Sequence, residues 1–292
     1  MSENGSSVCY ADHLSIVETA IEKVIEVARD TFLIRLEAPT IAAATVPGQF
    51  VMARFSGCDA PLIGRALAVY NIVDDANGLP RAIDLVFVRK GAFTTPLARS
   101  PLGTAISVWG PLGNGFSNRS CQTLVMAVGG IGQTPMLTLG LEALGTRQFG
   151  TARKSGWAKR VKLVYGARTA ALLACVDDFK NAGFDVELCT DDGTAGKRSR
   201  VPDRLFELLD CESDHSGTRV VTCGPEIMME KVATGCVERK LDCQVSMETP
   251  MACGIGICFS CVAKIRPAID QDWDYRRTCV EGPVFDATKV VW

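Results

Sequence analysis

The stretch Leu124-Val-Met-Ala-Val-Gly-Gly-Ile-Gly-Gln-Thr-Pro135 joins an unbroken apolar run to a glycine-rich turn and a proline. The residues after it, 136–144, carry a helical pattern, so the order strand, turn, helix is predicted here. Further short apolar runs at 161–165, 185–190 and 219–223 alternate with helical patterns at 170–182, 202–209 and 226–240. Strands that alternate with helices indicate βαβ units, so the middle of the chain is predicted to form a parallel sheet.

The residues before this stretch carry a different pattern. Short runs rich in Val, Ile and Phe are separated by Pro, Gly, Asn and Asp clusters, and these runs lie at 32–36, 50–55, 67–72, 83–88 and 105–109. Their regular spacing predicts a small antiparallel β-barrel. Residues 24–27 fit a helical stripe as well as a strand, and we favour the strand.

Three domains follow from these patterns. We expect an all-β barrel over 14–118, a parallel α/β domain over 119–242 and a small module over 243–292. The last segment mixes Cys, Gly, Pro and charged residues and has no periodic run long enough for its own core, which is typical of a module held by a metal centre. The polar insertion at 146–159 is predicted to be a loop.

The most specific motif is Cys253-Gly-Ile-Gly-Ile-Cys258-Phe-Ser-Cys261, with Cys279 downstream. The spacing C-x4-C-x2-C-x17-C matches the plant-type [2Fe–2S] pattern. Its two glycines let backbone N–H groups approach the sulfurs. Structural zinc is the main alternative, but zinc sites usually pair two short knuckles. Unrelated buried thiols are the third reading, and three cysteines within nine residues argue against it.

Composition limits the other function classes. The chain has 292 residues, 13 Cys, only 2 His and a formal net charge of −2. An odd cysteine count without an export signal favours a reducing compartment, and we expect a cytoplasmic protein that binds neither nucleic acid nor membrane. The scarcity of His makes a His-based site improbable. Eight cysteines outside the motifs are expected to be ordinary reduced thiols.

Two motifs in the middle segment point to a nucleotide. The turn 129–135 would let a pyrophosphate approach the backbone at a helix N-terminus, although it lacks the full dinucleotide fingerprint and could be only a structural turn. Cys223-Gly224-Pro225 follows the last predicted strand of this sheet, at the edge where open α/β sheets bind ligands. A thiol there could lie beside a nicotinamide, and the alternative is a small buried Cys before a helix.

Two motifs in the barrel fit a flavin. Arg65 in a strand could pair with a pyrophosphate through its planar fork, and Gly91 with the hydroxyls that follow it could accommodate phosphates. Taken alone, both motifs are better explained without a ligand, as an ordinary strand-edge Arg and a hairpin turn.

The order of these motifs resembles the iron–sulfur electron-transfer subunit of class 1B dihydroorotate dehydrogenase, a branch of the ferredoxin–NADP reductase superfamily. The resemblance extends from about residue 15 to the end and rests on segments 65–69, 91–94, 110–116, 129–135, 190–193, 223–225, 253–261 and 279–286. It implies an FAD in the barrel over 14–118, NAD(H) on the α/β domain over 119–242 and a [2Fe–2S] cluster in the module over 243–292. It further implies that electrons pass to or from an FMN-containing catalytic partner in a heterotetramer with two of each chain. In that enzyme the electrons come from dihydroorotate, in pyrimidine biosynthesis.

The resemblance also implies roles for individual residues. The flavin contacts are Arg65, Leu67, Ala68, Val69, Gly91 and Thr94; the nucleotide contacts are Gly130, Gly132, Pro135 and Gly224; Cys223 is the catalytic residue beside the nicotinamide; the cluster ligands are Cys253, Cys258, Cys261 and Cys279. The family usually has Pro and Ser where this chain has Ala66 and Ala68. Either Tyr70 or a backbone amide replaces the missing hydroxyl beside the flavin, or the flavin potential differs.

Other functions remain open at this stage. The chain could serve another FMN-containing dehydrogenase or demethylase, or an oxygenase. It could also be a redox-sensing or zinc-stabilised regulatory protein without flavin. NADPH is an alternative to NADH, because Arg168, Arg198 and Arg200 could meet a 2′-phosphate.

Overall fold

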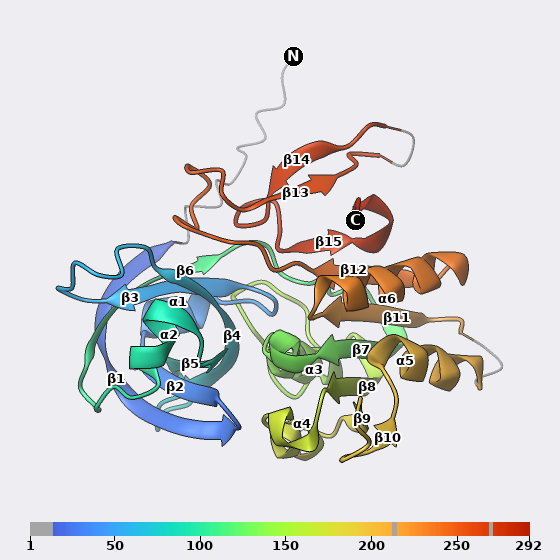
Figure 1. Cartoon of the computed structure of the whole chain (residues 1–292), viewed down its shortest axis with the longest axis horizontal. Helices are drawn as coiled ribbons and strands as arrows, with labels where there is room; N and C mark the ends of the chain where they lie inside the picture. Colours follow the sequence, from blue (N-terminus) through green and yellow to red (C-terminus); the bar gives the residue numbers. More distant parts are fainter. Residues whose placement is uncertain (1–13, 212–214, 269–270) are drawn as a thin grey trace.

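The protein is described by a computed structural model for residues 14–211, 215–268 and 271–292. Figure 1 shows a barrel on the left, a sheet flanked by helices on the right, and a hairpin unit above them. This arrangement confirms the predicted fold class of a barrel followed by an α/β unit.

The barrel is closed and antiparallel, with strand order β1-β2-β5-β4-β3-β6. Its elements are β1 (Ser15–Ala28), β2 (Thr31–Glu37), α1 (Pro39–Ala44), β3 (Phe50–Phe55), β4 (Arg65–Asp74), β5 (Pro80–Val88), α2 (Gly91–Leu97) and β6 (Ala105–Leu112). Strand β1 includes 24–27, as favoured from the sequence. Apolar side chains from the strands and from both helices fill the interior. The segment after Lys90 is a short helix, where the sequence left a hairpin turn open.

The second unit is a seven-stranded sheet in the order β10-β9-β8-β7-β11-β12-β15. The strands are β7 (Cys121–Gly129), β8 (Ala158–Ala167), β9 (Asp185–Thr190), β10 (Lys197–Arg198), β11 (Thr218–Cys223), β12 (Asp242–Ser246) and β15 (Val284–Asp286). The helical segments are η2 (Gly130–Gln133), α3 (Met136–Leu144), η3 (Ala170–Leu172), α4 (Val176–Asn181), α5 (Val201–Asp210), α6 (Glu226–Glu238) and η4 (Ala287–Lys289). All strand pairs are parallel except β12 with β15. The central strands β7 and β11 are buried almost throughout, and they appear in the sequence as largely apolar runs.

The helix predicted over 170–182 is interrupted. The Ala174 amide donates to the hydroxyl of the buried Tyr165 at 3.0 Å, so it is not available to continue the η3 turn. Cys175 then adopts a φ of 59°, and α4 starts after it. A tertiary hydrogen bond, which the local pattern does not reveal, therefore divides this segment.

The C-terminal residues are interleaved with the sheet. β12 pairs with β11, and β15 pairs with β12, so two strands that lie almost wholly within 243–292 extend the sheet of the preceding segment. Between them lie the cysteine loop and the hairpin of β13 (Val262–Ile265) and β14 (Asp274–Arg277). The boundary predicted at 242/243 falls inside β12, one residue after the strand begins.

A buried arginine holds the link between the barrel and the sheet. The guanidinium of Arg219 in β11 donates to the backbone oxygens of Ser117 and Arg119 at 3.2 and 2.8 Å and to Asp242 at 2.9 Å. It also lies over the Trp157 ring, 5.4 Å from its centroid. These contacts fix the connecting segment between β6 and β7 against the sheet.

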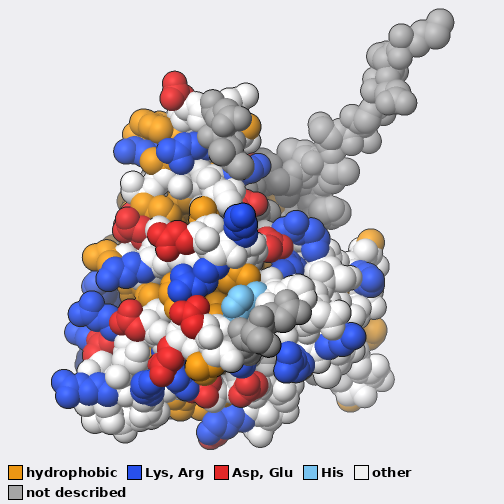
Figure 2. All heavy atoms as spheres, turned by 90° about the vertical axis from the view of Figure 1, so that its right-hand side faces the viewer, with side chains coloured by type: hydrophobic (Ala, Val, Ile, Leu, Met, Phe, Trp, Pro, Cys, Tyr) orange, Lys and Arg blue, Asp and Glu red, His pale blue; other side chains and the backbone are white. Residues whose placement is uncertain are grey.

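The face shown in Figure 2 carries Lys and Arg side chains interspersed with Asp and Glu. In the described part of the chain, no helix combines the length and the apolar character that crossing a membrane requires.

Candidate functional site

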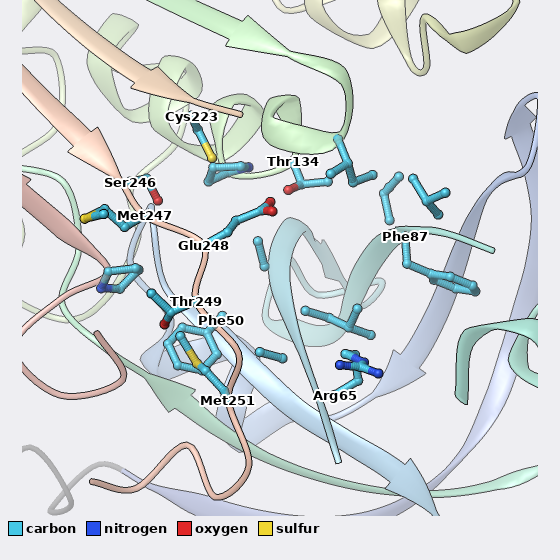
Figure 3. Close-up of a pocket in the computed structure, with 18 of the residues that line it drawn as sticks. Phe50, Arg65, Phe87, Thr134, Cys223, Ser246, Met247, Glu248, Thr249 and Met251 are labelled. Carbon is cyan, nitrogen blue, oxygen red and sulfur yellow. The ribbon is translucent and has the colours of Figure 1, made fainter. Parts of the chain in front are cut away.

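A cavity of about 550 Å³ lies between the barrel and the sheet, and its close-up is Figure 3. One wall comes from β3, β4, the end of β5 and the start of α2. The opposite wall comes from η2, the residues after it, Cys223 at the end of β11, and the segment that follows β12. The barrel and the carboxyl edge of the sheet therefore meet at this cavity.

Seven residues predicted from the sequence line this cavity together: Arg65, Leu67, Ala68, Gly91, Thr94, Pro135 and Cys223. Val69 does not line it, because its side chain is buried in the barrel interior. Leu67 belongs to the same buried cluster as Val69, but only Leu67 also lines the cavity.

The cavity has cationic groups on the barrel side. Arg65 is exposed to it, and no ion pair involves this side chain among the described residues. The Thr94 hydroxyl does not face a ligand freely, because it accepts from the Lys90 amide at 2.7 Å and donates to the Lys90 carbonyl. Thr94 therefore shapes the turn that presents Lys90 and Gly91 to the cavity.

Cys223 and Glu248 share the opposite wall. Figure 3 shows the Cys223 sulfur and the Glu248 carboxyl directed into the cavity, with Arg65 at the far end. Burial, followed by the nearby Glu248 charge, raises the pKa of the Cys223 thiol well above its ordinary value. Cys223 is therefore a neutral thiol, suited to packing against a ring and not to acting as a nucleophile.

A second cavity of about 820 Å³ lies at the carboxyl ends of β7, β8 and β9. Gly130 lines it, together with Arg168, Asp191, Arg200 and Lys231. Arg198 does not line it; its Nε donates to the Asp191 carbonyl at 3.3 Å. A groove at this edge, with a glycine turn and cations, fits a dinucleotide.

The two cavities share three lining residues, Val88, Lys90 and Ile131. Gly132 and Gly224, which were predicted to contact the nucleotide, line neither cavity, but they allow close backbone packing where the two cavities meet. A Cβ on Gly132 would come within 2.3 Å of the Cys223 carbonyl oxygen, and one on Gly224 within 2.9 Å of the Gly129 oxygen. These glycines let η2 lie directly against the end of β11.

The four predicted cluster ligands lie in two adjacent pairs. Cys258 is hydrogen-bonded with Cys253, and Cys279 with Cys261, while the charge of Cys253 also acts on Cys279. Within residues 14–211, 215–268 and 271–292, no group of three or more His, Cys, Asp or Glu side chains is arranged to hold a metal ion. The four thiols lie near one another, but they are not arranged as the four ligands of one metal centre.

The donor set and the surrounding backbone nevertheless fit an iron–sulfur cluster. The Ile255 amide donates to the Cys253 sulfur at 3.4 Å, and the Gly256 amide donates to that of Cys279. Hydrogen bonds from the Ser260 side chain and amide, with one from Cys253, lower the pKa of Cys258 to about 6. Amide hydrogen bonds to sulfur are the outer-shell interactions that stabilise and tune cluster thiolates.

The cysteine loop is fixed to the barrel. The Trp109 indole in β6 donates to the Cys253 carbonyl at 3.0 Å. Gly254 lies so close to Met52 that a Cβ would meet its Cγ at 2.6 Å. Phe50 packs in the same buried cluster as Cys261 and Cys279, and it also lines the first cavity. Phe50 therefore borders both the first cavity and the buried cysteines.

Asn114 connects two motifs that are far apart in the sequence. Its amide donates to the carbonyls of Glu281 and Val284 and accepts from the Val284 amide, at 3.1, 2.8 and 2.9 Å. These hydrogen bonds therefore hold the segment after β6 against the segment after Cys279.

Sequence reasoning missed Ser246, Glu248 and Thr249, which line the first cavity. They follow a strand that was assigned to the C-terminal module, so no signal linked them to a flavin or nicotinamide site. Tyr70 is a correction: its hydroxyl donates to Asp178 at 2.6 Å and it does not line the cavity. It cannot replace the hydroxyl that is missing at Ala68.

Comparisons with known proteins agree with this geometry. A family model described as the iron–sulfur cluster binding domain of dihydroorotate dehydrogenase B matches residues 248–291, which include all four cysteines. The chain is 32% identical over 278 residues to the dihydroorotate dehydrogenase B (NAD⁺) electron transfer subunit of Desulforamulus reducens, covering 95% of this chain and 98% of that protein. It is also 32% identical to the Clostridium perfringens subunit of the same name over 244 residues, with 83% and 86% covered.

A solved structure supports the same assignment. The chain matches the NADH-dependent reduced ferredoxin–NADP oxidoreductase, which was described for flavin-based electron bifurcation, with a TM-score of 0.77 and 25% identity, covering 94% of this chain and 90% of that one. Barrel, sheet and cysteine domain thus define an oxidoreductase of the ferredoxin reductase class. More narrowly, the chain belongs to the family of dihydroorotate dehydrogenase B electron transfer subunits.

Proposed function

We propose that this chain transfers electrons between NAD(H), an FAD and a [2Fe–2S] cluster, and exchanges them with an FMN-containing dihydroorotate dehydrogenase subunit. The observation that carries the proposal is the adjacency of three sites: two cavities with common walls, and a cysteine loop packed against the first of them. When bound, FAD takes two electrons as hydride and releases them singly, whereas the cluster carries one electron at a time.

The residues of the chain fit this division of work. The FAD would occupy the first cavity, with Arg65 and Lys90 as counter-charges for its pyrophosphate and the apolar β4 residues against its ring. The dinucleotide would occupy the second cavity at Gly130, and the neutral Cys223 thiol would pack beside the nicotinamide. Cys253, Cys258, Cys261 and Cys279 would ligate the cluster.

Apolar exposure on the cysteine domain supports a docked partner. Ile257 and Phe259 on the cysteine loop are 74% and 62% exposed, and Trp273 and Tyr275 at the hairpin are 42% and 54% exposed. Apolar side chains gathered on a surface are typical of protein interfaces. We propose that the FMN subunit covers this face, in a heterotetramer with two copies of each chain.

The cytoplasm is the compartment that we propose. The twelve cysteines within the described residues are all free thiols, which is the state maintained by a reducing environment.

The test is anaerobic purification of the chain co-expressed with the dihydroorotate dehydrogenase catalytic subunit. We expect FAD, iron and acid-labile sulfide in the complex, and reduction of NAD⁺ by dihydroorotate. A colourless complex that contains zinc would contradict the proposal. Cys279→Ser separates the cofactors, because the variant should lose iron and retain FAD.

A further inference from the structure

Arg277 connects the β13–β14 hairpin to the cysteine loop. It is the last residue of β14, two residues before Cys279, and its Nη1 donates to the Gly256 carbonyl at 3.0 Å. Its guanidinium carbon also lies 5.2 Å from the centroid of the Phe259 ring. Because Gly256 and Phe259 lie on either side of Cys258 in the sequence, one side chain contacts the loop both before and after this predicted ligand.

Gly256 links the guanidinium to a cysteine sulfur. Its carbonyl accepts from Arg277, while its amide donates to the sulfur of Cys279. An amide hydrogen bond to a thiolate depends on where the backbone is held, and such bonds tune a metal centre from outside its ligand set. Arg277 therefore positions the residue that supplies one of these bonds.

Glu281 provides the counter-charge of this arginine. Its Oε2 accepts from the Arg277 backbone amide at 2.7 Å and from the Arg277 Nε at 3.2 Å. The two side chains are only 30% and 31% exposed, so solvent screens their charges less than those of a fully exposed pair. The guanidinium thus binds a carboxylate through Nε and the cysteine loop through Nη1.

The cysteine loop carries no charged side chain of its own apart from its thiols. Residues 251–261 include no Asp, Glu, Lys or Arg. An iron–sulfur cluster gains one negative charge when it takes up an electron, so a nearby cation favours the reduced form and a nearby anion favours the oxidised form. Arg277 and Glu281 therefore act in opposite directions on a cluster held by this loop.

We propose that Arg277 is a positioning residue of the cysteine loop and that its charge, opposed by that of Glu281, sets the reduction potential of the cluster. The hydrogen bond to Gly256 holds the loop in place, and the permanent positive charge favours uptake of the electron. The inference rests on the proposed function, because it needs a [2Fe–2S] cluster on the four cysteines.

The experiment is a redox titration of the anaerobically purified full chain, in which electron paramagnetic resonance follows the reduced cluster. In Arg277→Gln we expect the equilibrium constant for cluster reduction to fall by about tenfold, which lowers the midpoint potential by about 59 mV. In Glu281→Gln we expect the midpoint potential to rise. Arg277→Lys keeps the charge and loses the planar fork, so its potential should lie closer to the original than that of Arg277→Gln.

Arg276→Gln is the matched control, because Arg276 is the neighbouring cation on β14. It pairs with Asp274 and Glu281 at 3.6 and 3.8 Å, and among the described residues it makes no hydrogen bond with the cysteine loop. Its loss should change the equilibrium constant by about twofold or less. Equal shifts in Arg276→Gln and Arg277→Gln would show that the contact with the loop has no special effect and would overturn the proposal.

The remaining outcomes also decide the matter. Shifts of the same sign in Arg277→Gln and Glu281→Gln, or no shift in either, would contradict the proposal. If Arg277→Gln does not retain iron, Glu281→Gln decides: a raised potential supports the proposal, and an unchanged or lowered one contradicts it. An unmodified chain that binds no [2Fe–2S] cluster would contradict the proposed function itself and with it this inference.

Discussion

The protonation state of the Cys223 thiol depends on its burial. It is 4% exposed, and burial raises its pKa above the ordinary value of 9.0. Because the folded-state pKa lies above that of a free cysteine, the thiol stays protonated across the neutral range and no thiolate forms in the cavity.

This gives a prediction on pH dependence. The rate of flavin reduction by NADH should show no inflection from this thiol between about pH 7 and about pH 9, the range where an unperturbed cysteine titrates. Cys223→Ser should lower the rate by about tenfold, as expected for a misplaced ring, without changing the shape of the profile. An inflection between about pH 8 and about pH 9 that vanishes in Cys223→Ser would show instead that the thiol ionises.

Glycine 254 decides how the cysteine loop meets the barrel. Its φ of 73° is unfavourable for other residues, and its Cα lies against Met52 and Leu112. Gly254→Ala should push the loop off the barrel, lower the iron content and slow electron transfer from flavin to cluster. Iron analysis and stopped-flow absorbance measure both effects.

Gly103→Ala is the control for this change. Gly103 also has a positive φ, 85°, but a Cβ there would have no atom within 4 Å. It shares the backbone strain, about 1 kcal/mol, without the collision. Equal iron loss in the two variants would show that strain alone, and not contact with Met52, disturbs the loop.

At the scale of elements, Arg219 is the strongest single link between β11 and the connection from the barrel. Its side chain is 5% exposed, and it bonds Asp242 and two backbone carbonyls. Arg219→Lys loses the planar fork and leaves buried acceptors unpaired, which should lower the free energy of unfolding by about 2 kcal/mol. Urea denaturation followed by circular dichroism measures it.

Arg119→Lys provides the comparison, since Arg119 pairs with the same Asp242 but its side chain is 63% exposed. An exposed pair contributes little, so the expected loss is about 0.5 kcal/mol or less. Equal losses in the two variants would mean that the buried contacts of Arg219 do not stabilise the fold.

The sequence predicted the helices and strands better than it predicted the contacts between them. Largely apolar runs placed β7 and β11 closely, because parallel strands buried on both faces leave a strong local signal. The break before α4 depends on the Tyr165 hydroxyl, and the insertion at 146–159 is fixed by Arg153 and Trp157, which both donate to the buried Glu142. Such contacts join residues distant in sequence, so no local pattern contains them.

The candidate site shows the same difference between residues that local motifs identify and residues that only the fold brings to the cavity. Local motifs identified Arg65, Gly91 and Cys223, which the fold brings to one cavity. Glu248 escaped prediction because it follows a strand assigned to another module, and it reaches the cavity only when β12 pairs with β11. Val69 belongs to the same motif as Arg65, but its side chain is buried in the barrel interior and does not line the cavity.

At the scale of the whole molecule, the exposed apolar side chains of the cysteine domain should determine assembly. Phe259→Ser with Ile257→Ser should abolish co-purification with the FMN subunit while FAD and iron content stay unchanged. Leu102→Ser is the control, because Leu102 is 65% exposed on the barrel, outside the cysteine domain. Light scattering after size exclusion measures the assembly, and a double variant that still assembles would place the interface elsewhere.

The central claim is that FAD and a [2Fe–2S] cluster in this chain form one path for electrons from NADH. An anaerobic titration of the purified full chain with NADH, followed by visible absorbance and electron paramagnetic resonance, tests it most directly. We expect three electrons to enter each chain, two on the flavin and one on the cluster, with a reduced-cluster signal that is absent in Cys279→Ser. Bleaching of the flavin alone, with no reduced-cluster signal in the unmodified chain, would contradict it.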